Sequence, residues 1–113
     1  MTRQTLPTRR QGFVIDAEWE GHPFTIGYSF YPDTGRVGEV FADVQKGGQM
    51  QATLSDACTL ISIALQHGIT VPELEKSMSE APDLMRGGGA TLPASPVGAI
   101  LDALGAEIAG GEV

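Results

Sequence analysis

The residues of this chain that could do chemistry are few and far apart. Cys58 is the single cysteine, and His22 and His67 are the two histidines. Cys58 falls inside an apolar run, where burial raises the pKa of a thiol and the side chain acts as a small hydrophobe. The histidines do not have the spacing of a metal-ligand pair. We therefore expect no nucleophilic cysteine, no metal site and no cofactor.

Acidic residues offer a second kind of chemistry. Four acidic residues alternate with apolar residues in two segments and could gather on the polar side of a sheet: Asp16, Glu18, Glu39 and Asp43. Paired carboxylates supply general acid–base catalysis. A solvated face is the more common role of such a set, and no nucleophile or triad accompanies it.

A third candidate is the turn Lys46-Gly47-Gly48, which lies just before an apolar helical segment. Free N–H groups at the start of a helix attract anions, so this turn could hold a phosphate. It lacks the length and the terminal Lys-Ser/Thr of a P-loop, and an ordinary turn explains the same residues.

Alternation of apolar and polar residues predicts three strands, at about 12–20, 23–31 and 37–45. In the second strand, Phe24, Ile26, Tyr28 and Phe30 share the inward face. In the third strand, Phe41 has the opposite parity from Val40, Ala42 and Val44, so the pattern leaves its inward face open.

Apolar residues at steps of three and four predict a central helix at about 50–67. Leu60 and Ile63 widen its apolar stripe over most of the circumference. A short helix at about 72–79, with Thr70 as its N-cap, and a C-terminal helix at about 96–109, with Ser95 as its N-cap, follow. The segment from Pro82 to Ala94, with three consecutive glycines, is expected to be a mobile loop.

Strands followed by helices predict an α+β fold, an antiparallel three-stranded meander whose apolar face is covered by the central helix. The edges of such a sheet are exposed, so a second copy could pair edge to edge as a homodimer. We expect an extended basic arm at 1–11, one domain at 12–109 and a flexible tail at 110–113.

Charge is divided unevenly along the chain. The net charge is −7, and Arg3, Arg9 and Arg10 lie in the first ten residues, so the rest of the chain is strongly acidic. An acidic body argues against nucleic-acid binding, because Lys and Arg supply most of that affinity. Without an apolar signal segment or a membrane span, we expect a cytoplasmic protein and no membrane partner.

Four segments together resemble the TSCPD domain family: RQTLPTRR at 3–10, GEVFADVQKGG at 38–48, ISIALQHGITVPEL at 61–74 and ASPVGAILDAL at 94–104. This family includes the C-terminal region of vitamin B12-dependent ribonucleotide reductases and small free-standing bacterial proteins, and the free-standing class is the closer match. The cysteine-bearing segment that names the family has no counterpart here, because no cysteine follows Glu80.

The resemblance implies a non-catalytic interaction module that associates with itself or with a larger protein partner, rather than an enzyme on its own. The alternative is an accessory subunit of nucleotide metabolism that binds a nucleotide or phosphate near Lys46–Gly48. The two ends of the central helix are the expected site. The candidate binding residues are Glu39, Lys46, Gly47, Gly48, His67, Arg9 and Arg10.

Overall fold

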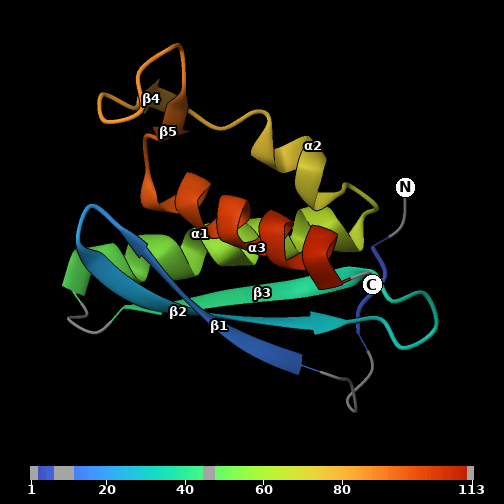
Figure 1. Cartoon of the computed structure of the whole chain (residues 1–113). Helices are drawn as coiled ribbons and strands as arrows, with labels where there is room; N and C mark the ends of the chain where they lie inside the picture. The colour runs from blue at the N-terminus through green and yellow to red at the C-terminus, as the bar shows by residue number, and fades with distance from the viewer. Residues whose placement is uncertain (1–2, 7–11, 45–47, 112–113) are drawn as a thin grey trace.

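The protein is an α+β domain in which helices cover one face of a three-stranded antiparallel sheet (Figure 1). The computed structural model describes residues 3–6, 12–44 and 48–111. The sheet has the order β1-β2-β3, with strands at Gly12–Trp19, His22–Phe30 and Val37–Val44. The predicted strands are confirmed to within one residue at each end. Glu20 and Gly21 form the two-residue turn between β1 and β2 and both have positive φ, as a tight hairpin turn requires.

Three helices follow: α1 at Gly48–Gln66, α2 at Val71–Glu75 and α3 at Pro96–Gly111. Thr70 is the N-cap of α2, as predicted, and forms a capping box with Glu73. The prediction that this helix continues to residue 79 is wrong. Beyond Glu75 the N–H groups of Ser77 and Met78 bond to carbonyls three residues back, so the chain continues as tighter turns.

The segment expected to be a mobile loop forms a short antiparallel ribbon instead. Its strands are β4, Glu80–Pro82, and β5, Thr91–Pro93, with Ala81 opposite Leu92. The turn between them is hydrogen-bonded within itself, because the N–H of Asp83 donates to Ala90 O at 2.9 Å and the N–H of Gly87 donates to Asp83 O at 2.9 Å. Three-residue strands are too short to leave an alternation in the sequence.

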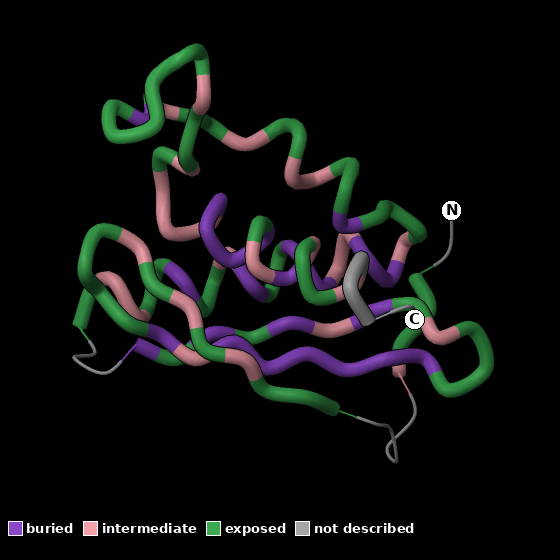
Figure 2. Tube along the Cα trace, in the orientation of Figure 1, coloured by how far each residue is buried: buried purple, intermediate pink, exposed green. Residues whose placement is uncertain are grey.

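The core lies between the sheet and the two long helices (Figure 2). The four inward residues of β2 are buried, as predicted. The open question on β3 is settled: Val40, Ala42 and Val44 face the core, whereas Phe41 points to the opposite face and is 53% exposed. Helices α1 and α3 complete the core with Leu54, Cys58, Ile61, Leu65, Ile100, Leu101 and Leu104.

Helix α1 lies along β3, while α3 packs over β1 (Figure 1). Apolar residues cover most of the circumference of α1, as the sequence indicates, but the structure does not bury the helix on all sides. Leu60 is 69% exposed, and Ser62 and Gln66 are buried in its place. Among the described residues, no helix is long and apolar enough to span a membrane.

Candidate functional site

The C-terminal end of α1, where the sequence predicts a site, is closed by its own backbone. Gly68 has φ +98° and donates its N–H to Leu65 O at 3.0 Å, and Ile69 donates to Ala64 O at 3.1 Å. This is a Schellman motif, which satisfies the last carbonyls of a helix. The N–H of His67 is likewise bonded to Ile63 O and Ala64 O. The last carbonyl groups of α1 are therefore bonded within the chain.

Gln66, the residue before this cap, joins three parts of the chain. Its Nε2 donates to Gly38 O at 2.8 Å, and its Oε1 accepts from Arg3 Nε at 2.6 Å. Its backbone carbonyl accepts from the N–H of Gln4 at 2.8 Å, and the Tyr31 hydroxyl donates to Gln4 O. The described part of the N-terminal arm is thus bonded to the domain.

Polar side chains of α1 also occupy the outer edge of β3. Ser62 bonds both the N–H and the carbonyl of Val40, and Gln51 accepts from the N–H of Val44 at 2.7 Å and donates to Ala42 O at 3.2 Å. These contacts use the backbone groups that a further strand would need. Edge-to-edge pairing with a second copy would therefore have to use β1.

The other predicted site residues do not converge. Gly48 is the first residue of α1, with φ +80°, and His67 follows its last residue. A helix of 19 residues separates them by roughly 28 Å. Glu39 lies on β3, opposite Ser29 on the face turned away from the helices. Lys46, Gly47, Arg9 and Arg10 lie outside the described residues, so phosphate binding near Lys46–Gly48 stays a prediction.

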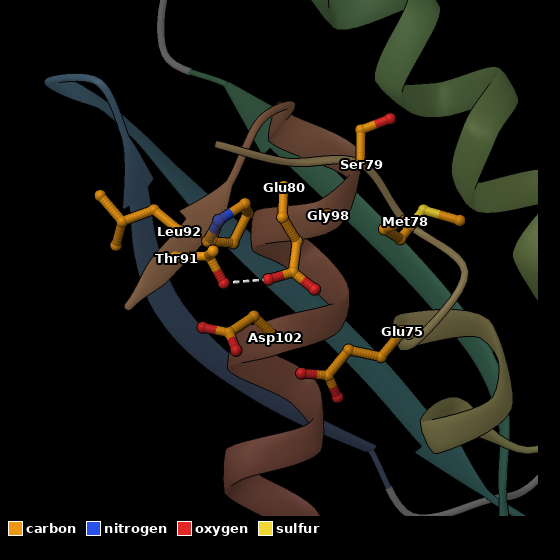
Figure 3. Close-up of a pocket in the computed structure, with 9 residues that line it drawn as sticks. Glu75, Met78, Ser79, Glu80, Thr91, Leu92, Gly98 and Asp102 are labelled. Atoms are coloured by element: carbon orange, nitrogen blue, oxygen red, sulfur yellow. Dashed lines mark hydrogen bonds between the residues drawn. The ribbon is translucent and has the colours of Figure 1, made fainter. Parts of the chain in front are cut away.

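A cavity that the sequence did not predict lies where the ribbon meets α2 and α3 (Figure 3). It has a volume of about 230 Å³ and brings together Glu75 of α2, Glu80 of β4 and Asp102 of α3. Gly105 allows this arrangement, because a Cβ at that position would come within 2.5 Å of Glu75 Oε1. Gly98 and Gly105 lie two turns apart on α3. They are the one signal in the sequence that other parts of the chain pack closely against this side of the helix.

The carboxylates of this cavity affect one another. The pKa of Glu75 is raised, first by burial, then by its hydrogen bond with Asp102 and by the negative charges of Asp102 and Glu80. Thr91 Oγ1 donates to Glu80 Oε1 (Figure 3). Carboxylates this close to one another favour a shared proton or a cation between them. Among the described residues, no cluster of three or more His, Cys, Asp or Glu is placed to hold a metal ion.

Cys58 is buried in the core, and its burial raises the pKa of the thiol to about 11, although a backbone hydrogen bond with Ala42 acts in the opposite direction. A thiol in this state is a poor nucleophile. The packing role predicted for Cys58 fits its position.

The tip of the ribbon exposes two large apolar side chains on a well-bonded turn. Leu84 is 91% exposed and Met85 is 96% exposed. Buried Asp83 holds the turn, because its Oδ1 accepts from the N–H groups of Met85 at 3.1 Å and Arg86 at 3.2 Å. Three successive glycines, 87 to 89, take positive φ and bring the chain back to β5. The ribbon tip, residues 83–90, therefore presents Leu84 and Met85 in a defined shape.

Comparison with known proteins gives matches at the level of sequence. The TSCPD domain model matches residues 2–108. A vitamin B12-dependent ribonucleotide reductase from Agrobacterium fabrum is 36% identical over 72 residues, and one from Bradyrhizobium diazoefficiens is 32% identical over 72 residues. Each alignment covers 63% of this chain but 6% of the reductase. No solved structure matches.

Proposed function

Because the chain belongs to the TSCPD domain family, we propose that it is a non-catalytic interaction module that docks onto a larger protein through the tip of the β4–β5 ribbon. The observation that carries this proposal is the exposure of Leu84 and Met85 on a turn held by Asp83. A hydrogen-bonded turn loses little backbone freedom on binding, and the large apolar side chains that it exposes can fill a pocket on a partner.

Three residues that could have served a catalytic site are taken up by the core and by hydrogen bonds within the domain. The Cys58 thiol is buried with a raised pKa, and the polar residues of the family signature, Ser62 and Gln66, bond to backbone groups of the domain. The similar reductases are far longer than this chain, so their activity is not assigned to it. A vitamin B12-dependent reductase is the first partner to test. The single unpaired cysteine supports a cytoplasmic location.

Affinity purification from the source cell tests the proposal with two variants. Leu84→Ser combined with Met85→Ser removes the apolar tip but keeps the Asp83 bonds, which go to backbone N–H groups. Leu60→Ser is the matched control, because Leu60 is an exposed leucine on α1. We expect the tip variant to recover at least about tenfold less of the partner, as for loss of a hot spot, and the control to match the wild type. Equal recovery by all three proteins would contradict docking through the ribbon.

A further inference from the structure

The face of the sheet turned away from α1 and α3, here called the outer face, has an ordered arrangement of side chains. Strand register places its residues in rows that cross the sheet. One row is Val14, Gly27 and Phe41, and the next is Asp16, Thr25 and Asp43. None of the described helices lies on this face (Figure 1).

The first row is apolar and exposed. Val14 is 69% exposed and Phe41 is 53% exposed. The Phe41 ring lies over Gly27, where a Cβ would come within 2.3 Å of a ring atom. The glycine therefore lets an aromatic ring cover the middle strand, and an apolar strip reaches from β1 to β3.

Carboxylates border this strip. The acidic residues of the three strands are Asp16, Glu18, Glu39 and Asp43, and the register places all of them on the outer face. The three strands contain no lysine or arginine. Asp16 and Asp43 both lie opposite Thr25, which separates them by two strand spacings, roughly 10 Å.

We propose that the outer face binds a basic amphipathic helix of a partner protein. An α-helix is roughly 10 Å wide, so a helix that runs along the strands above β2 could contact Val14 and Phe41 and place lysines or arginines from its two flanks near Asp16 on β1 and Asp43 on β3. A second copy of this chain does not fit, because facing sheets would bring like charges together. Anionic membranes and nucleic acids are disfavoured for the same reason.

Two synthetic peptides test the proposal on the full-length protein. One is an amphipathic helix of leucine and lysine, and the other replaces each lysine with glutamate. We expect the lysine peptide to bind, with an affinity that falls as the salt concentration rises from about 0.05 to 0.3 M, and the glutamate peptide not to bind. Binding of both peptides with similar affinity would overturn the proposal.

Charge-matched variants then locate the binding surface. Asp16→Asn with Asp43→Asn removes two charges from the outer face, and Asp33→Asn with Asp56→Asn removes two exposed charges elsewhere. We expect the first pair to weaken lysine-peptide binding about fivefold and the second pair to leave it within about twofold. Equal effects of the two pairs would show attraction by net charge alone and would overturn the proposal.

The apolar strip is tested separately with Val14→Ser, because Val14 is exposed at the start of an edge strand and its loss leaves the core intact. Leu60→Ser is the control. We expect weaker binding of the lysine peptide by the first variant only. An unchanged affinity in Val14→Ser would overturn the apolar part of the site.

Discussion

Ser62 Oγ on α1 accepts a hydrogen bond from the N–H of Val40 on β3 at 2.9 Å and donates one to the Val40 carbonyl at 3.1 Å. Both residues are buried. Gln51 and Gln66 make similar bonds to the same strand, one on each side along the helix. The side chains of α1 thus take the place of a neighbouring strand, and Ser62 and Gln66, in the family-like segment 61–74, have a structural role.

Ser62→Ala is expected to destabilise the fold by about 1–3 kcal/mol, because it leaves the N–H and carbonyl of Val40 buried without their partner. Thr53→Ala, at an exposed position on the same helix, is the control and should be neutral or slightly stabilising. Urea unfolding monitored by circular dichroism measures both. Equal stability of the two variants would mean that the Val40 bonds contribute little.

Gly38→Ala tests how the N-terminal arm is held. A Cβ on Gly38 would lie 2.6 Å from the buried Tyr31 ring and 3.0 Å from Leu6. We expect a loss of about 1–3 kcal/mol from this overpacking, with faster hydrogen exchange at the Gln4 amide. Gly12→Ala is the control, because its nearest neighbour would be Ser29 Oγ at 3.4 Å. If the Gln4 amide exchanges equally fast in both variants, the arm does not depend on this contact.

Glu75→Gln should raise stability at neutral pH. The folded protein raises the pKa of Glu75 above its ordinary value of 4.5, chiefly through burial, so it binds this proton more tightly than the unfolded chain. Stability of the wild type therefore falls as the pH rises from about 4.5 through the raised pKa, and the variant lacks this loss. Urea unfolding at several pH values should show the gain at neutral pH and its disappearance below about pH 4.

Glu73→Gln provides the opposite case for the same experiment. Hydrogen bonds from the backbone and side chain of Thr70 lower the pKa of Glu73. The folded protein therefore favours the charged carboxylate of Glu73. This carboxylate stabilises the fold at neutral pH, and the stabilisation is lost as the pH falls through the lowered pKa. We expect this variant to be less stable than the wild type at neutral pH. A gain in stability in both variants would contradict the assignment of the two environments.

Cys58 should react slowly with thiol reagents while the protein is folded. Its pKa of about 11 lies two units above its ordinary value of 9.0, so the thiolate fraction near pH 8 falls about a hundredfold. The rate of reaction with iodoacetamide, measured with and without denaturing urea, checks this. Reaction at the same rate in both conditions would show an accessible thiol and contradict the burial of Cys58.

Local patterns predicted most of the secondary structure, but they did not predict which polar residues are buried. The alternation of Phe24, Ile26, Tyr28 and Phe30 identified β2, and Thr70 marked the start of α2 correctly. Ser62 and Gln66 could not be predicted as buried, because a polar residue on a helix is expected to face water until a strand edge is known to lie beside it.

The cavity and the ribbon could not be predicted from the sequence, for a different reason. Glu75, Glu80 and Asp102 come together only after the chain has folded back, and the ribbon strands are too short to show a period. The sequence indicated that Asp16 and Asp43 could gather on one face, but the pattern of β3 left open whether Phe41 faces the core, and the packing of α1 on Val40, Ala42 and Val44 decides this.

Photo-crosslinking in the source cell tests the central claim, docking through the ribbon tip, most directly. A photo-reactive amino acid is placed at Met85 in one variant and at Leu60 in the other, two exposed positions on different elements. The proposal predicts a covalent adduct with one larger protein from position 85 and none from position 60. Adducts with the same protein from both positions, or none from position 85, would contradict it.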